Sequence, residues 1–280
     1  YRQGRITATG SLVYTNVTEH VKIGDAPTDF QRLAPSFTVS LQPWQEQLLF
    51  LRLMYKSTFR MPTFNDLYYY RLGNRSLRPE KANEYNMGIT WSRSFSSFLN
   101  YLSVTVDGYY NDVTDKIVAF PTTYAWKMAN YGKVHVTGMD ATLAAAASLG
   151  KNMVLVVSGG YTWQKAIDLT DATSKSYKDQ LPYTPKHSGN VSAVLEMPWV
   201  NVGYSIVGVS ERYSMSQNIP ENRIDGYMEH TVSLSRNFSF RHCKLRLQAE
   251  IINLTDTQYD VIKYYPMPGR SWRLTGTIEF

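Results

Sequence analysis

The chain has 280 residues, of which 43% are hydrophobic, 14% aromatic and 19% charged, and its formal net charge at pH 7 is +6. This composition excludes a disordered chain and a collagen-like chain, and the single cysteine excludes an internal disulfide scaffold. No apolar run reaches the roughly 18 to 20 residues that a membrane-spanning helix requires, so a helical membrane protein is also excluded.

Alternation of apolar and polar residues, which is typical of β-strands, runs from one end of the chain to the other. The sequence predicts twelve strands, at roughly 4–16, 33–42, 47–57, 81–92, 98–113, 130–147, 152–165, 187–197, 199–212, 226–238, 242–255 and 269–280. In the last of them the apolar residues Trp272, Leu274 and Ile278 are separated by polar residues. Because successive side chains of a strand point to opposite faces, each strand has one oily face and one polar face.

The connections between these strands alternate in length. Short connections fall at 42–46, 93–97, 149–151, around 198 and at 239–241, and long ones at 17–32, 58–80, 114–129, 166–186, 213–225 and 257–268. A β-sandwich with Greek-key crossings mixes its loop lengths. Strict alternation instead places all tight turns at one end and all long loops at the other. We therefore predict an all-β, antiparallel, up-and-down transmembrane β-barrel.

A closed sheet pairs every backbone N–H and C=O within the protein and so spans a membrane without long apolar runs. The oily faces are expected to contact lipid and the polar faces to line an aqueous lumen. Aromatic residues near strand ends are expected to form interfacial girdles. These residues are Tyr14, Trp44, Tyr55, Trp91, Trp163, Trp199 and Trp272.

Two sequence blocks in or beside the long connections have distinctive motifs. The first block runs from Phe59 through Arg60, Pro62 and Thr63 to the tyrosines at 68–70, and continues with Gly-Asn at 73–74 and Leu-Arg-Pro-Glu at 77–80. The second contains Asn-Leu-Thr-Asp at 253–256, a tyrosine at 259 and Tyr-Pro-Met-Pro-Gly-Arg at 265–270. Together the two blocks resemble those of TonB-dependent outer-membrane receptors. The terminal Phe280, which ends an alternating strand, resembles the signal that the outer-membrane insertion machinery reads.

The resemblance implies active transport of a scarce, large nutrient across the outer membrane of a Gram-negative bacterium, energised through TonB. Receptors of this family have about 22 strands around an N-terminal plug. We therefore expect residues 1–280 to be the C-terminal part of such a barrel, with the plug and first strands absent from this chain. The expected partners are that missing N-terminal portion, the TonB complex acting through it, the lipid bilayer with its lipopolysaccharide, and a surface lipoprotein. Because the basic residues are dispersed, no nucleic-acid partner is expected.

Aromatic side chains of the long loops are candidates for ligand binding, because binding sites combine aromatic surface with a few polar groups. The candidates are Phe64, Tyr68, Tyr69, Tyr70, Arg71, Tyr124, Trp126, Tyr213, Tyr264 and Tyr265. The first block looks most like the cobalamin and siderophore branch of the family, and we favour cobalamin slightly over a ferric siderophore.

Two other transport functions remain as alternatives. Haem receptors of this family typically carry a histidine within the first block, and residues 59–77 contain none, which disfavours haem uptake. A passive porin without a plug is disfavoured by the two receptor-like blocks.

An enzyme is not expected. The five histidines are separated from any recognisable nucleophile or carboxylate partner, and no catalytic constellation is apparent. The sequence has neither a cysteine pair nor a His-x-x-x-His pattern, so it predicts no metal site and no cofactor.

Overall fold

The computed structural model describes residues 2–18, 20, 22, 29–96, 98–121, 126–150, 152–241 and 243–279. In chain order the elements are β1 (Arg2–Gln3), β2 (Ile6–Val17), β3 (Phe30–Leu41), β4 (Leu48–Arg60), α1 (Phe64–Tyr68), β5 (Glu80–Ser94), β6 (Leu99–Pro121), β7 (Trp126–Gly150), β8 (Met153–Asp168), β9 (His187–Glu196), β10 (Asn201–Val209), β11 (Arg212–Tyr213), a 3-10 turn (Pro220–Asn222), β12 (Arg223–Ile224), β13 (Tyr227–Ser239), β14 (Lys244–Ile252), β15 (Asp260–Ile262), β16 (Tyr265–Pro266) and β17 (Ser271–Glu279).

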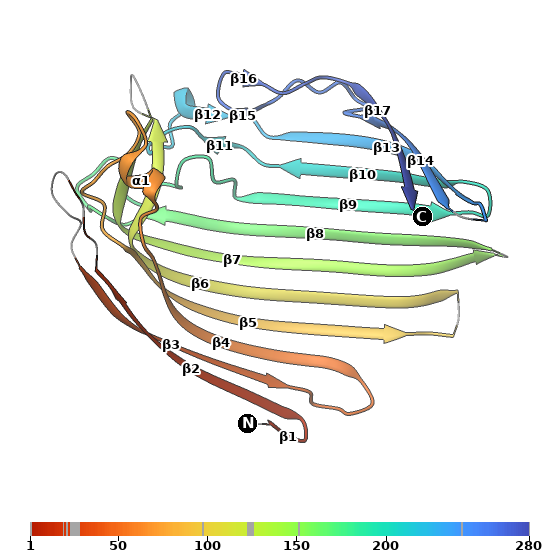
Figure 1. The fold of residues 1–280 in the computed structure, drawn as a ribbon, viewed down its shortest axis with the longest axis horizontal. Coiled ribbons are helices and arrows are strands. Elements are labelled where there is room, and N and C mark those ends of the chain that lie inside the picture. Colours follow the sequence, from red (N-terminus) through yellow and green to blue (C-terminus); the bar gives the residue numbers. More distant parts are fainter. Residues whose placement is uncertain are drawn as a thin grey trace.

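One antiparallel sheet of 13 strands dominates the structure, in the order β1-β2-β3-β4-β5-β6-β7-β8-β9-β10-β13-β14-β17 (Figure 1). Because β1 has only 2 residues, twelve full strands remain, and each overlaps one of the predicted strands. Every full strand pairs with the next full strand along the chain. The predicted antiparallel, up-and-down arrangement is therefore confirmed.

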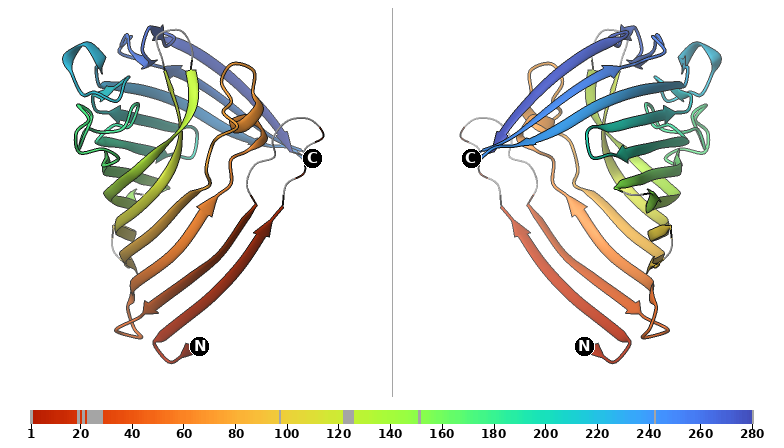
Figure 2. Two further views of the ribbon diagram at one scale, coloured as in Figure 1. Left: turned by 90° about the vertical axis from the view of Figure 1, so that its left-hand side faces the viewer. Right: turned by 90° about the vertical axis from the view of Figure 1, so that its right-hand side faces the viewer.

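The sheet curves into an open trough, with the short β1 and β2 along one edge and β17 along the other (Figure 2). Tight turns join the strands at one end, on the right in Figure 1, and α1, β11 and β12 lie at the opposite end. We call the second end the loop end. The alternation of short and long connections predicts one end with tight turns and one end with loops, and the sheet has these two different ends.

The apolar side chains of neighbouring strands share one face of the sheet, which we call the outer face. Leu53, Met87, Gly108, Met139 and Trp163 form one cross-strand row of it. The side chains of Leu53, Met87 and Met139 are exposed. The apolar positions therefore do not fill a dry centre, and they form the surface that a transmembrane barrel presents to lipid.

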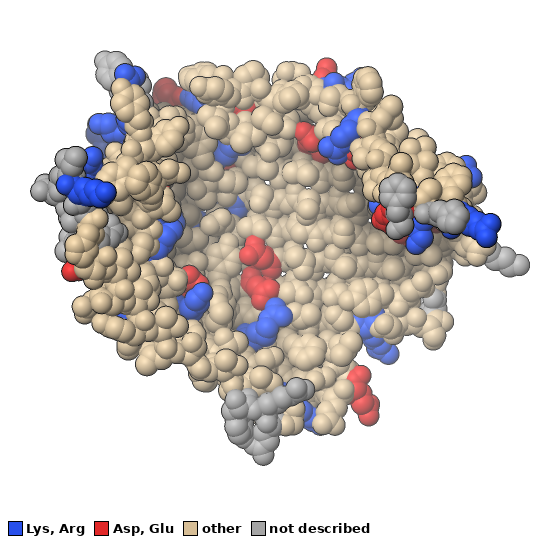
Figure 3. All heavy atoms as spheres, in the orientation of Figure 1, with Lys and Arg blue, Asp and Glu red and all other residues tan. Residues whose placement is uncertain are grey.

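Polar residues occupy the inner face, which is the concave side of the trough. Figure 3 looks onto this hollow and shows acidic and basic side chains close together near its middle. Arg52 of β4 donates to the carboxylate of Asp107 on β6 across 2.8 Å, and to Thr90 Oγ1 on β5 across 2.9 Å. Gly88 of β5 lies between Arg52 on β4 and Asp107 on β6, and a Cβ added to it would stand 1.9 Å from Asp107 Oδ1. The glycine thus leaves room for this ion pair to cross a strand.

Small apolar clusters lie on the inner face near the loop end. Ala82, Val113, Val134, Val136 and Ala166 form one of them, and Leu181 of the β8–β9 connection packs onto it. Because these residues bury apolar area against a loop, the cluster holds that connection inside the trough.

The prediction of a long loop at 114–129 is wrong. β6 continues to Pro121 and β7 begins at Trp126, so these two strands form a hairpin that extends well beyond their neighbours. Strand pairing overrides the weaker local signal here, because a strand is stabilised by its cross-strand partner as much as by its own propensity.

Four of the seven aromatic residues predicted to form girdles lie towards the ends of the sheet, whereas Tyr55 and Trp163 lie within β4 and β8. Trp44 and Trp199 lie in turns opposite the loop end and are exposed, as are Tyr14 and Trp272 nearer the loop end. Among the described residues, no helix has the length and apolar composition needed to cross a bilayer.

Candidate functional site

The first sequence block folds into an anchored loop at the loop end of the trough. Thr63 caps the short helix α1, because its hydroxyl accepts from the Asp66 N–H across 3.2 Å while the Asp66 carboxylate accepts from the Thr63 N–H across 2.8 Å. Leu67 and Leu77 are buried against Ile117 of β6 and Met128 of β7. The loop therefore docks on the extended β6–β7 hairpin.

Backbone contacts fix the same loop to the hairpin. The Met128 N–H donates to Leu72 O across 2.9 Å, and Asn74 Nδ2 donates to Met128 O across 3.1 Å. Gly73 passes so close to α1 that an added Cβ would stand 2.7 Å from Leu67 O. The Gly-Asn of the block is thereby explained: the glycine permits the close approach, and the asparagine binds the neighbouring strand.

Charged residues of the block form a network behind the loop. Arg60 contacts Asp66 at 3.1 Å and Glu80 at 3.6 Å, and Lys116 contacts Glu80 at 3.6 Å. The Glu80 carboxylate also accepts from the Ile117 N–H across 3.0 Å. The Arg and Glu residues that mark the block in the sequence therefore have a structural role, since they join the ends of β4 and β5 to β6.

The predicted ligand-binding side chains of this loop divide into a displayed group and a packed one. Phe64 and Tyr70 are 76% and 78% exposed, and Tyr69 is exposed as well. Arg71, at a φ of 63°, stacks over the Tyr70 ring at 5.1 Å. Tyr68 is half-buried against the apolar cluster beneath it. Of the predicted ligand-binding residues, the anchored loop thus presents three aromatic rings and the Arg71 guanidinium to its surroundings.

A second aromatic group lies on the β8–β9 and β10–β13 connections. Trp126 contacts the Tyr183 ring with centroids 5.7 Å apart, and the Tyr183 N–H donates to Tyr213 O across 2.7 Å. Burial raises the pKa of Tyr183. Trp126 is the first residue of β7 and not a loop residue as expected, whereas Tyr213 belongs to the short strand β11 and is half-buried. The structure thus brings both Trp126 and Tyr213 into contact with Tyr183, which the sequence did not single out.

Arg212 joins the last two connections and was missed by sequence reasoning. It is 4% exposed and donates to the carbonyl oxygens of Asp260 and Val261 across 2.5 and 3.1 Å. Its guanidinium lies 5.8 Å from the Tyr227 ring, which stacks on Tyr259 with centroids 3.9 Å apart. The contacts of Arg212 are with carbonyls 48 and 49 residues further along the chain, so no local pattern marks it.

The second sequence block shapes the connection that carries Tyr264 and Tyr265. Asn253 is fully buried, and its side chain accepts from the Thr257 N–H and donates to the Thr257 carbonyl, both across 2.9 Å. The β15–β16 hairpin that follows turns at Tyr264, whose φ is 70°. Tyr264 and Tyr265 are 82% and 70% exposed. Among the described residues, no hydrogen bond, ion pair or ring contact joins them to the loop of α1.

Two predicted residues cannot be placed. Tyr124, a candidate ligand-binding residue, and Phe280, the candidate assembly signal, lie outside the described residues. No group of three or more His, Cys, Asp or Glu residues that could hold a metal ion is present in the described part of the chain.

Comparison with known proteins decides the family. A family model described as "TonB dependent receptor-like, beta-barrel" matches residues 1–254. The chain belongs to this family of TonB-dependent receptor barrels. The family is one of receptors and transporters, and the predicted family membership is thereby confirmed.

Two relatives with an assigned activity are vitamin B12 transporters. The chain is 26% identical over 230 residues to the vitamin B12 transporter BtuB of Photobacterium profundum. This alignment covers 79% of this chain and 34% of the relative. It is also 26% identical over 231 residues to BtuB of Vibrio vulnificus, covering 79% of this chain and 33% of that protein. The chain thus spans about a third of the length of these relatives.

Solved receptor structures share the fold. BauA, the ferric preacinetobactin receptor of Acinetobacter baumannii, superposes with a TM-score of 0.72 at 13% identity, over 99% of this chain and 40% of BauA. The siderophore receptor PiuA of the same organism superposes with a TM-score of 0.70 at 17% identity, over 98% of this chain and 41% of PiuA. At these identities the likeness establishes the barrel architecture alone.

Proposed function

We propose that this chain forms the C-terminal part of an outer-membrane receptor that imports cobalamin or a ferric siderophore, energised through TonB. The observation that carries the proposal is the anchored loop of α1, which displays Phe64, Tyr69, Tyr70 and Arg71 at the loop end of the trough. A large ligand loses less entropy on binding to a surface that is already ordered. The anchored loop meets this requirement, because its buried side and its exposed side are separate sets of residues.

Cobalamin is the substrate that we favour. Large apolar surfaces and rings pack well on exposed aromatic side chains, and a guanidinium adds a group that binds carbonyl or anionic oxygens. The vitamin B12 transporters among the relatives support this choice over a ferric siderophore. The β15–β16 hairpin, with Tyr264 and Tyr265, would contribute a second aromatic wall.

The rest of the receptor is expected to complete the barrel. The edges of the sheet at β1 and β17 present backbone groups that must be paired inside a bilayer. We propose that further strands of the receptor pair with both edges and that the N-terminal plug occupies the concave side, against the Arg52–Asp107 pair. The plug would then carry the contact with TonB, and a surface lipoprotein would bind at the loop end.

Ligand binding by the receptor that contains this chain tests the proposal. Equilibrium binding of cobalamin, haem and ferric siderophores should show tight binding of cobalamin or of one siderophore. Replacing Tyr70 with Ala should weaken that binding by about tenfold, or about 1.4 kcal/mol, because a stacking surface is lost. Tight binding of haem alone would contradict the proposed substrate class. Ion conductance through the purified receptor without any ligand binding would instead favour a passive porin.

A further inference from the structure

A groove interrupts the outer face of the sheet near the loop end. Gly189 of β9 pairs directly with Gly208 of β10, and the two glycines are flanked by Tyr161 of β8 and Met228 of β13 in the same cross-strand row. Because neither glycine has a side chain, the row is empty between Tyr161 and Met228. Three strand spacings separate the two walls, which is roughly 14 Å between backbones. The groove encloses about 440 Å³.

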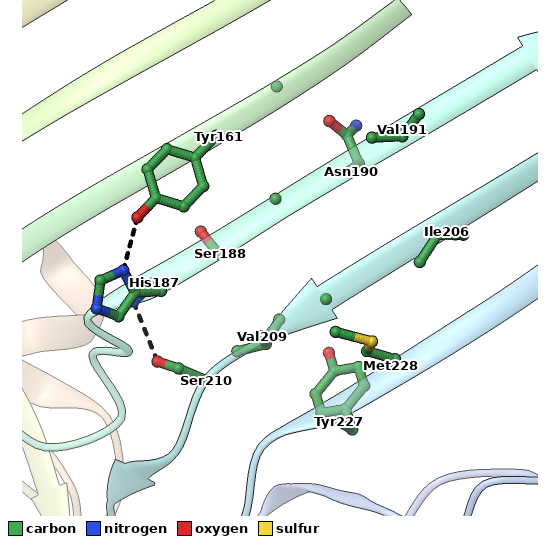
Figure 4. Close-up of a pocket in the computed structure, with 13 residues that line it drawn as sticks. Tyr161, His187, Ser188, Asn190, Val191, Ile206, Val209, Ser210, Tyr227 and Met228 are labelled. Carbon is green, nitrogen blue, oxygen red and sulfur yellow. Dashed lines mark hydrogen bonds between the residues drawn. The ribbon is translucent and has the colours of Figure 1, made fainter.

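The lining of this groove is mainly apolar. Val191 and Ile206, which pair with each other in the neighbouring row, continue its floor towards the middle of the strands (Figure 4). Val191 and Met228 are exposed. The groove is therefore continuous with the apolar outer face, which a transmembrane barrel turns to lipid.

Polar groups gather at the rim that lies nearest the loop end. β9 begins at His187, and the His187 N–H donates to Ser210 Oγ across 3.0 Å just beyond the end of β10. The His187 ring is hydrogen-bonded through Nδ1 to the Tyr161 hydroxyl across 2.7 Å (Figure 4). In the described structure Nε2 of this ring has no hydrogen-bond partner, so it is free to bind a ligand. Lys165, on the same face of β8, is exposed and places a positive charge further towards the loops.

We propose that this groove binds one phosphate-bearing lipid of the outer leaflet, with an acyl chain over Gly189 and Gly208 and the head group beside His187 and Lys165. The inference rests on the proposed outer-membrane location. The position of the groove indicates a lipid as its ligand, because an apolar groove continuous with the lipid-facing surface is filled by hydrocarbon. A rim that carries an imidazole and an ammonium group favours an anionic head group over a neutral one.

Gly208 allows the groove to be filled without strain. A Cβ added there would meet Met228 Cγ at 3.8 Å, which is an ordinary contact, whereas at Gly189 it would stand 2.9 Å from Gly160 O. Gly208→Leu therefore occupies the groove and leaves the backbone in place. Gly10→Leu is the matched control, because Gly10 also lies on the outer face, opposite Phe37, and an added Cβ there meets nothing within 4 Å.

Native mass spectrometry of the receptor purified from outer membranes in mild detergent tests the proposal. The unmodified receptor should retain a phosphate-bearing lipid through stepwise delipidation. Gly208→Leu should lower the retained amount by about tenfold, and Gly10→Leu should leave it unchanged. Equal retention by Gly208→Leu, or equal loss in both variants, would overturn the proposal. Ligand uptake is measured in parallel, so a failed transport function is distinguished from an absent lipid site.

A second measurement uses the unmodified receptor and does not depend on the variants. A lipid A with a photoreactive acyl chain, as the phosphate-bearing lipid of the outer leaflet, should label peptides containing Tyr161, Val191 or Met228. The same photoreactive lipid A without its phosphates should label them several-fold less. Absence of labelling there would overturn the groove assignment, and equal labelling by both lipids would overturn the role of the phosphate.

Discussion

Single glycines decide where side chains of this receptor barrel can meet. Gly73 lets the chain pass against α1, and Gly88 lets Arg52 reach across β5 to Asp107. In each case the neighbouring atoms stand closer to an added Cβ than van der Waals contact allows. A substitution at Gly73 therefore tests the loop of α1, and a substitution at Gly88 tests the barrel wall, each independently of the other.

Replacing Gly73 with Ala is expected to displace the loop of α1. The added methyl would lie 2.7 Å from both Leu67 O and Tyr69 N, which are backbone atoms and cannot rotate away. Ligand affinity should fall by about tenfold or more, or at least about 1.4 kcal/mol, while the barrel still inserts. Ligand titration together with limited proteolysis of the loop measures this. Gly10→Ala, with open space around the new methyl, is the control and should bind ligand normally.

Replacing Gly88 with Ala is expected to separate Arg52 from Asp107. Because both side chains are partly exposed, the loss of unfolding free energy attributable to this ion pair should stay near or below about 1 kcal/mol. Thermal unfolding in detergent measures the change. Gly108→Ala on the next strand is the control, since the nearest atom to its added Cβ is 4.0 Å away. A larger loss in the control than in Gly88→Ala would contradict this account of Gly88.

At the scale of elements, Arg212 ties the β15–β16 hairpin to the β10–β13 connection. Replacing Arg212 with Met should remove two hydrogen bonds to the carbonyls of Asp260 and Val261 and lower local stability by about 2 to 3 kcal/mol. Amide hydrogen exchange should then accelerate across 253–268. Arg223→Met is the comparison, because Arg223 is half-exposed and its ion pairs with Glu211 and Asp225 should contribute less than about 1 kcal/mol. Equal acceleration in both variants would contradict a specific role for Arg212.

The Tyr259–Glu229 contact gives the same region a pH dependence. Burial, together with the hydrogen bond to the Glu229 carboxylate across 2.6 Å, raises the pKa of Tyr259 well above its usual value of about 10. The folded state therefore favours the neutral phenol, so this stabilisation is complete below about pH 10 and is lost as the pH rises through the folded pKa. Tyr259→Phe should show a shallower loss of stability above pH 10 in denaturant titrations. An unchanged slope would argue against this assignment.

Sequence reasoning succeeded for elements whose signal is local. The alternation in segments such as 269–280 requires only the period of two residues, so twelve strands and their order were predicted. The β6–β7 extension was missed because pairs such as Lys116 with Tyr131 stabilise strands across the hairpin. Arg212 and Tyr183 were missed because their partners lie on other connections. Exposed aromatics such as Tyr70 and Tyr264 were recognised as loop residues, but the anchoring beneath the loop of α1 depends on contacts that the sequence does not display.

At the scale of the whole molecule, the central claim is that the two faces of one curved sheet meet two different solvents. Along β5, Tyr85, Met87 and Ile89 share the outer face, and Asn86 and Thr90 share the inner face. This arrangement explains the moderate hydrophobicity of the chain, because only half of each strand contacts hydrocarbon. It also explains why the ligand-binding candidates gather at one end, where every long connection emerges.

Site-directed spin labelling along β5 tests this claim most directly. Single cysteines at 84–92, in a receptor carrying Cys243→Ser, are labelled and reconstituted in lipid bilayers. Labels at 85, 87, 89 and 91 should be accessible to dissolved oxygen, and labels at 84, 86, 90 and 92 to a water-soluble nickel complex. The account predicts this alternation with a period of two residues. Uniform accessibility along the strand, or the opposite alternation, would contradict it.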